Sequence, residues 1–173
     1  MQRVNTYDEQ KLLLTADKAL EEFSGMIYRL ARSLSKNNEM EAQEVFQDVF
    51  ERFLKYGTKK EYDSIEHAKN WFVRVTINCH NALIKRNQKR REIEYDEQIV
   101  DMDEIGEESR DYHSLTEAVN ELKEKYRIVI HLMYYEGYKI SEIAELLEEN
   151  ENTIKTRLAR AKKTLRKKLE DDR

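Results

Sequence analysis

The sequence contains no proline, four glycines and one cysteine among 173 residues. Sandwich folds and glycine-rich phosphate loops depend on turn residues that are scarce here, so both are disfavoured. The longest run without Asp, Glu, Lys or Arg, residues 75–84, holds 10 residues, whereas a membrane helix needs roughly 18. The first ten residues also lack the apolar core of a secretion signal. We therefore expect a cytoplasmic protein that does not insert into membranes.

Residues that would support catalysis or metal binding are equally sparse. The single cysteine, Cys79, cannot form a disulfide framework, which suits the reducing interior of a cell. Cys79 precedes His80, but two further metal ligands at workable spacing are missing, so a buried thiol is the better prediction. The chain shows no Ser, His and Asp constellation and no glycine-rich phosphate cradle. The sequence therefore predicts no enzyme activity, no metal site and no cofactor.

The charged residues, 38% of the chain, are strongly segregated. Residues 92–111 contain ten acidic residues against one arginine, a net charge of −9, so the formal net charge of −4 leaves +5 on the rest. The basic residues gather in two clusters, which are Lys85, Arg86, Lys89, Arg90 and Arg91, and then Lys155, Arg157, Arg160, Lys162, Lys163, Arg166, Lys167 and Lys168. A charged run is often only a solvated helix face. Two such clusters on separate helical segments make a two-point contact with nucleic-acid phosphates a credible alternative.

The acidic stretch separates two regions of helical sequence pattern. It has few large apolar residues and includes Gly106 and Ser109. Such a segment buries too little apolar surface to offset the entropy that it would lose on ordering. We therefore predict an all-α protein of two small helical domains, residues 1–91 and 114–173, joined by a flexible acidic linker at residues 92–113.

Apolar residues at helical spacing predict that the first domain is a bundle of about four helices over residues 6–91. The first two core stripes are Leu20, Phe23, Ile27, Leu30, Ala31 and Leu34, and Ala42, Val45, Phe46, Val49, Phe50 and Phe53. Thr6 and Glu9 form a capping box for a short leading helix. Gly57 begins a loop, and the last helix is expected to start between residues 64 and 67.

The second domain shows the pattern of a helix-turn-helix. Ser114 and Glu117 form a capping box that predicts a helix start, and Gly137 ends a helix predicted over residues 123–135. Two amphipathic segments follow, at 140–147 and 152–169, separated by four polar residues. In a helix-turn-helix the second segment, which here is rich in Lys and Arg, lies in the DNA major groove. An ordinary helical hairpin is the alternative on spacing alone.

Three segments are similar to motifs of one protein family. Residues 41–50, EAQEVFQDVF, match a DAEDLxQEVF string, with Gln43 where an acid is usual. Residues 71–78, WFVRVTIN, match a WLxRIAxN string that precedes a basic helix end. Residues 153–161, TIKTRLARA, match a TVKSRLxRA string, with Thr156 where serine is common. Because these motifs keep their order, the chain resembles bacterial RNA polymerase sigma factors of the sigma-70 family, specifically the extracytoplasmic-function group that keeps only regions 2 and 4.

The resemblance implies a transcription initiation factor that directs core RNA polymerase to promoters and helps to separate the DNA strands. The second domain would recognise the minus-35 element with the residues that match the family's recognition helix, which are Lys155, Thr156, Ala159 and Arg160. Phosphate contacts are expected from Arg157, Lys162, Lys163 and Arg166. Ile154, Leu158, Ala161 and Leu165 have the spacing of the buried face of the same helix.

By the same resemblance, the first domain would recognise the minus-10 element. The expected contacts are Trp71, Arg74, Asn78, Lys85 and Arg86, with Tyr56 and Tyr62 as further flat surfaces for bases. Trp71 is equally compatible with a position in the core. A flipped base would be held by the loop at residues 56–67, and the sequence does not reveal which side chain holds it.

The resemblance also implies protein partners. A row of polar positions on one helix would bind the β′ clamp helices of core RNA polymerase; it consists of Glu41, Glu44, Gln47, Asp48 and Glu51. The same row would also suit a helix face that is only solvated. Further expected partners are the polymerase β flap and an anti-sigma factor, and the free protein is expected to be a monomer.

Two other functions fit parts of the sequence. A stand-alone helix-turn-helix regulator would bind promoter DNA without polymerase, and it would not need the carboxylate row at residues 41–51. A helical adaptor would bind proteins and have no DNA role.

Overall fold

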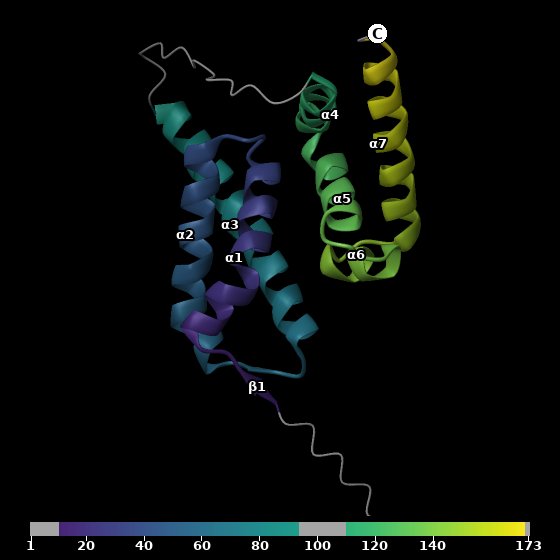
Figure 1. The fold of residues 1–173 in the computed structure, drawn as a ribbon. Helices are drawn as coiled ribbons and strands as arrows, with labels where there is room; N and C mark the ends of the chain where they lie inside the picture. Colours follow the sequence, from purple (N-terminus) through teal and green to yellow (C-terminus); the bar gives the residue numbers. More distant parts are fainter. Residues whose placement is uncertain (1–10, 94–109, 172–173) are drawn as a thin grey trace, which may run out of the picture.

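The structure is a computed structural model that describes residues 11–93 and 110–171. Its described residues form seven α-helices in two groups, which we call the first unit (residues 11–93) and the second unit (residues 110–171) (Figure 1). The all-α prediction is confirmed. No helix among the described residues combines the length and the apolar composition that a membrane crossing demands.

Local capping explains how the first two helices begin. Helix α1 (Ala16–Leu34) starts after Thr15, whose hydroxyl accepts a hydrogen bond from the backbone N–H of Lys18 at 3.3 Å. Helix α2 (Glu39–Tyr56) starts after Asn38, whose side-chain oxygen accepts from the backbone N–H of Glu41 at 3.2 Å. The two core stripes predicted for these helices point inward, except that Leu20 is 48% exposed.

A small two-stranded sheet closes one end of the first unit, and the sequence pattern did not predict it. Strand β1 (Leu12–Leu13) pairs antiparallel with β2 (Glu61–Tyr62), which follows the short 3-10 helix η1 (Gly57–Lys59). Gly57 is needed here for space, because a Cβ at this position would lie 2.2 Å from Cδ2 of Phe53.

Helix α3 (Ile65–Ile93) completes the first unit and starts where it was predicted. Phe72 of α3 packs against Phe23 of α1 and Phe53 of α2, with ring centroids 4.8 and 5.1 Å apart. The described part of the unit therefore contains three helices rather than about four. The leading helix predicted from Thr6 lies outside the described residues.

The second unit contains α4 (Arg110–Asn120), α5 (Glu124–Tyr134), α6 (Ile140–Leu146) and α7 (Glu151–Asp171). The last three helices match the predicted segments, and Gly137 adopts a φ of +75° after α5. The prediction that Ser114 opens the first helix is wrong, because α4 already begins at Arg110. Helical structure thus enters both ends of the segment predicted as a linker.

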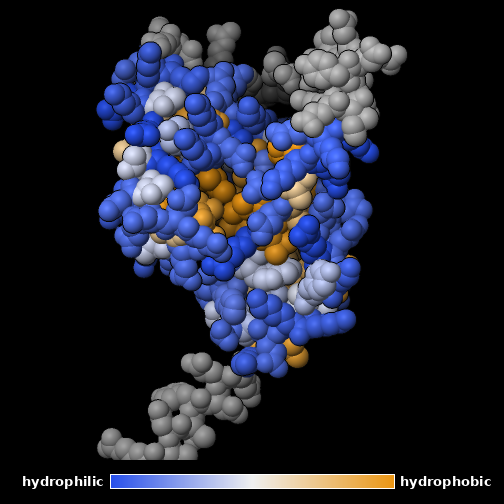
Figure 2. All heavy atoms as spheres, turned by 180° about the vertical axis from the view of Figure 1, so that it is seen from behind, coloured by the Kyte–Doolittle hydropathy of each residue, from blue (hydrophilic) through white to orange (hydrophobic). Residues whose placement is uncertain are grey.

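The two units pack against each other, α1 and α3 of the first unit contacting α5 and α6 of the second (Figure 1). Buried apolar residues of both units join one continuous cluster. Seen from behind, the surface is mostly hydrophilic, and hydrophobic atoms show mainly in a central recess (Figure 2). The packing leaves α7 on the side of the second unit that faces away from the first (Figure 1).

Candidate nucleic-acid interface

Helix α7 has one apolar face and one basic face, as the sequence predicts. Ile154, Leu158 and Ala161 are buried against the rest of the second unit, and Leu165 is half-buried. The predicted DNA contacts on the opposite side are exposed; they are Lys155, Thr156, Ala159, Arg160, Lys162 and Lys163. This orientation leaves the basic side chains accessible to a polyanion.

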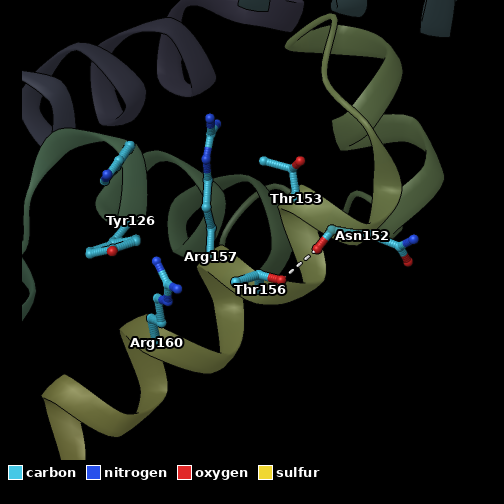
Figure 3. A pocket seen from close by; sticks show the side chains of 7 residues that line it. Tyr126, Asn152, Thr153, Thr156, Arg157 and Arg160 are labelled. Atoms are coloured by element: carbon cyan, nitrogen blue, oxygen red, sulfur yellow. Dashed lines mark hydrogen bonds between the residues drawn. The ribbon is translucent and has the colours of Figure 1, made fainter.

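Hydrogen bonds and ion pairs order the N-terminal turn of α7. The side-chain oxygen of Asn150 accepts from the backbone N–H of Asn152 at 2.7 Å, and the Thr156 hydroxyl donates to the carbonyl of Asn152 at 2.8 Å (Figure 3). The ammonium group of Lys155 lies 3.5 Å from the carboxylate of Glu151. These contacts are local, so they hold the turn in place without covering the basic face.

Arg157 differs from its basic neighbours. It is half-buried, and its guanidinium pairs with the carboxylate of Glu149 in the turn before α7. Arg160 instead donates a hydrogen bond to the hydroxyl of Tyr126 on α5, which lowers the pKa of Tyr126 below its usual value.

Helix α2 presents the predicted carboxylate row. Glu44, Gln47 and Glu51 are exposed, whereas Glu41 and Asp48 are half-buried. The Glu44 carboxylate pairs with Arg86 of α3, so the row predicted for polymerase touches a residue predicted for DNA. Met40 and Leu54, which were not among the predicted contacts, are 80% and 55% exposed at the two ends of the row. Their helical spacing from Glu44, Gln47 and Glu51 would have been the signal.

Helix α3 places its predicted contacts in different surroundings. Asn78 and Lys85 are exposed, and Arg74 donates to the carbonyl of Glu145 in α6 at 3.2 Å, so it lies at the contact between the units. Trp71 is half-buried and packs edge-on against Phe53 and Phe72, with centroids 5.9 and 5.0 Å apart.

The two tyrosines predicted as base platforms have opposite surroundings. Tyr56 is 60% exposed. The prediction for Tyr62 is wrong, because its ring is fully buried under the small sheet and its hydroxyl donates to the carbonyl of Gly57 at 3.3 Å. Burial also raises the pKa of Tyr62 to about 12.

Comparisons with known proteins show the family to which the chain belongs. Residues 112–165, which contain α5, α6 and most of α7, match the family model described as sigma-70, region 4. The RNA polymerase sigma factor SigV of Bacillus subtilis is 33% identical over 142 residues, which cover 82% of this chain and 83% of that protein. The chain belongs to the extracytoplasmic-function group of the sigma-70 family. The sigma factor SigW of the same organism is 26% identical over 170 residues, with 86% of each chain covered.

A solved structure shares the fold of this sigma factor over nearly its whole length. The sigma factor RpoE of Bartonella quintana, crystallised in complex with the anti-sigma factor NepR, superimposes with a TM-score of 0.72 at 21% identity. The match covers 91% of this chain and 98% of that one. The family assignment confirms the resemblance stated from the three motifs.

Cys79 of the sigma factor is fully buried, as predicted, and burial raises the pKa of its thiol to about 11. A thiol in this state is a poor nucleophile and a poor metal ligand near neutral pH. Within residues 11–93 and 110–171, no group of three or more His, Cys, Asp or Glu side chains is arranged to hold a metal ion.

The polar residues at the contact between the units were not predicted from the sequence. Arg127 of α5 is only 2% exposed and donates to the carbonyl of Leu34, at the end of α1, at 2.9 Å. The Glu136 carboxylate is also buried; it accepts two hydrogen bonds of 3.2 Å from Arg29 and lies 3.2 Å from Nε2 of His131. The signal available in the sequence was Arg127 and His131 standing four residues apart within an otherwise apolar helix face.

Burial and hydrogen bonding act on Glu136 in opposite directions. Burial alone would raise its pKa, but the nearby His131 side chain and the two hydrogen bonds from Arg29 hold the pKa below its usual value. Glu136 therefore stays ionised within the contact, and the charge of Arg29 is compensated there.

Proposed function

We propose that this sigma factor binds core RNA polymerase through α2 and directs it to promoters, reading a minus-35 element with α7 and a minus-10 element with α3. The observation that carries the proposal is the two-faced α7, which buries its apolar residues and exposes its basic ones at the end of a helix-turn-helix. Lys155, Thr156, Ala159 and Arg160 would face base edges, and the more C-terminal lysines would contact phosphates.

The minus-10 element would be handled by α3 and the loop before it. Arg74, Asn78, Lys85 and Arg86 supply cations and an amide along one helix, and the exposed Tyr56 offers a ring on which a base can stack. Trp71 would add only its exposed edge, because its ring already packs on the core.

Occupying both elements requires the units to separate. The names of the elements place them about 25 base pairs apart, or about 85 Å along B-form DNA. In the structure Arg74 of α3 contacts α6, and α6 packs directly against α7, so the two reading helices lie within one packed body. A polymerase that binds both units would hold them at the required distance, and the linker, at 92–113, would allow the movement.

The acidic linker would also act inside the polymerase. Its net charge of −9 over residues 92–111 suits passage through a channel that is built to hold RNA. Deleting residues 96–108 would then weaken initiation and spare the binding of each promoter element. Unchanged yields of abortive and full-length transcripts from the deletion variant would contradict this role.

The polymerase-binding role rests on the row of α2 that runs from Met40 to Leu54. Carboxylates in its middle would orient the sigma factor on a basic partner, and the apolar side chains at its ends would bury surface. We place the protein in the cytoplasm, where polymerase and DNA are. We also propose an anti-sigma partner, since the structural relative was crystallised with one.

Run-off transcription on a promoter library tests the function directly. The sigma factor with core polymerase should give sequence-selective transcripts that core polymerase alone does not give. The double variant Glu44→Lys/Asp48→Lys should lose both capture of core polymerase and transcription. The control Glu21→Lys/Glu22→Lys makes the same charge change on exposed positions of α1 and should keep both. DNA binding without transcripts would indicate a stand-alone regulator, and neither activity would indicate an adaptor.

A further inference from the structure

A pocket of about 390 Å³ lies between α5 and the N-terminal half of α7 (Figure 3). Its lining combines residues of both helices, which are Lys125, Tyr126, Asn152, Thr153, Thr156, Arg157 and Arg160. We infer that this pocket binds one backbone phosphate of promoter DNA, so that Lys125 and Tyr126 of α5 join α7 in holding the minus-35 region. The inference rests on the proposed function and extends it to a second helix.

The position of the pocket on α7 sets what can enter it. Successive residues of an α-helix are turned by about 100°. Thr153, Arg157 and Arg160 therefore lie to one side of the exposed face that carries Lys155 and Ala159. Thr156 lies between these two groups of residues. A DNA strand that presents bases to Thr156 and Arg160 would pass its sugar-phosphate backbone over the adjacent pocket.

The charge of the pocket favours an anion. Lys125 and Arg160 are exposed cations at its two walls, and Arg157 is compensated by Glu149. The Thr156 hydroxyl already donates to the carbonyl of Asn152, and Arg160 is the residue proposed to read a base, so Lys125 supplies the charge-assisted donor to the phosphate. Phosphate oxygens are the acceptors that such donors prefer in protein–DNA contacts.

Tyr126 gives the pocket its second role. Figure 3 shows Arg160 rising from α7 toward the Tyr126 ring, and the hydroxyl of Tyr126 accepts a hydrogen bond from Arg160. The ammonium group of Lys125 lies 5.3 Å from the centroid of the same ring. Because a guanidinium carries five N–H donors, Arg160 can keep this bond while it contacts DNA. Tyr126 is thus a positioning residue for Arg160.

The first test measures the salt dependence of promoter binding by the sigma factor with core polymerase. Lys125→Gln should weaken binding about fivefold at about 0.15 M salt and reduce the salt slope by about one. It should leave the preference for the cognate minus-35 element unchanged. The matched control is Lys123→Gln, which removes an exposed charge two residues earlier that does not line the pocket, and its slope should equal the wild-type slope. Equal slopes for Lys125→Gln and the wild-type protein would overturn the inference.

The second test locates the phosphate. Single uncharged methylphosphonates are placed along both strands of the minus-35 region. A methylphosphonate at one position should weaken binding of the wild-type protein about fivefold. The same substitution should not change binding of Lys125→Gln, because that variant has already lost the contact to this phosphate. Additive effects at every position would overturn the inference.

The third test addresses Tyr126 through selectivity. Tyr126→Phe keeps the ring and removes the acceptor, so it should lower discrimination at the base pair read by Arg160 without lowering the melting temperature. Full selectivity in Tyr126→Phe would overturn the positioning role. Failure of the proposed function would appear differently, as a wild-type protein with polymerase that shows no promoter selectivity.

Discussion

Arg127 is the largest of the fully buried side chains, and its guanidinium satisfies four backbone carbonyls. Two of them, from Asn120 and Leu122, lie in the second unit at 3.0 and 2.7 Å. The other two, from Ser33 and Leu34, lie at the end of α1. A planar guanidinium with five donors fits this arrangement, whereas an ammonium group does not.

Replacing Arg127 should therefore destabilise the protein strongly. Arg127→Met removes the donors and leaves buried carbonyls unsatisfied, so the free energy of unfolding should fall by about 2–4 kcal/mol. Arg127→Lys should recover only part of the loss. Denaturant unfolding measures both variants, with Arg166→Met on the exposed side of α7 as the control. A fully stable Arg127→Met protein would contradict the structural role.

His80 makes the stability depend on pH. Its side chain is 2% exposed, and burial lowers its pKa; Glu124, 3.8 Å away, opposes the shift, and Arg127 adds to it. Below an unfolded-state pKa of about 6.5 the unfolded chain binds a proton that the folded protein resists. The contribution of neutral His80 is thus complete above about pH 6.5 and is lost as the pH falls toward the folded pKa.

The expected result is a free energy of unfolding that falls between about pH 7 and pH 5.5, by at most about 1.4 kcal/mol per pH unit from this group. His80→Gln should flatten the profile in this window. His67→Gln, at a side chain that is 39% exposed, should keep the wild-type profile. A wild-type profile in His80→Gln would show that another group is responsible.

Glu136 acts in a separate pH window. Because its pKa is lowered in the folded protein, its contribution to stability is lost only as the pH falls below about 4.5.

At the scale of the element, α7 separates base reading from phosphate contact along one helix. Arg160→Ala should cost about 1–3 kcal/mol against the cognate minus-35 element and relax preference at one base pair. Lys163→Ala should weaken cognate and altered elements by the same factor, because phosphates carry no sequence information. Both residues are exposed, so folding should be unaffected. Competition binding by the protein with core polymerase measures, for each variant, the ratio of its affinities for the cognate and the altered element. An equal loss of preference in both variants would contradict the separation of base reading from phosphate contact.

At the scale of the whole molecule, polar contacts hold the two units together. Arg29 donates twice to Glu136, and the ammonium group of Lys69 donates to the Glu136 carbonyl at 3.0 Å while lying 4.6 Å from the Tyr138 ring centroid. Both basic residues come from the first unit and both acceptors from the second. Their loss should therefore weaken the contact more than it weakens either unit.

The double variant Arg29→Ala/Lys69→Ala should have a larger radius of gyration than the wild-type protein in small-angle scattering, with the helix content unchanged. This variant also loses two positive charges. The control Lys18→Ala/Arg52→Ala removes two positive charges at exposed positions of the first unit that do not contact the second. Identical scattering from the wild-type protein and the Arg29→Ala/Lys69→Ala variant would mean that apolar burial alone holds the units together.

The sequence by itself determined the helices and the two faces of α7, because apolar residues three and four positions apart need only one neighbouring surface to bury them. It also determined the buried thiol of Cys79 and, through three motifs, the family. The helix start at Ser114 was wrong because a capping box is a local signal that also occurs inside longer helices, here α4.

Only the tertiary structure decided the remaining features, since each depends on chain segments that are far apart in sequence. Tyr62 is buried because β2 pairs with β1 about fifty residues earlier. Arg127 is buried because α5 packs on the end of α1, where free carbonyls need donors. The pocket beside α7 exists because α5 packs against α7 and brings Tyr126 close to Arg160. Periodicity describes one helix at a time, whereas these sites form only where two helices meet.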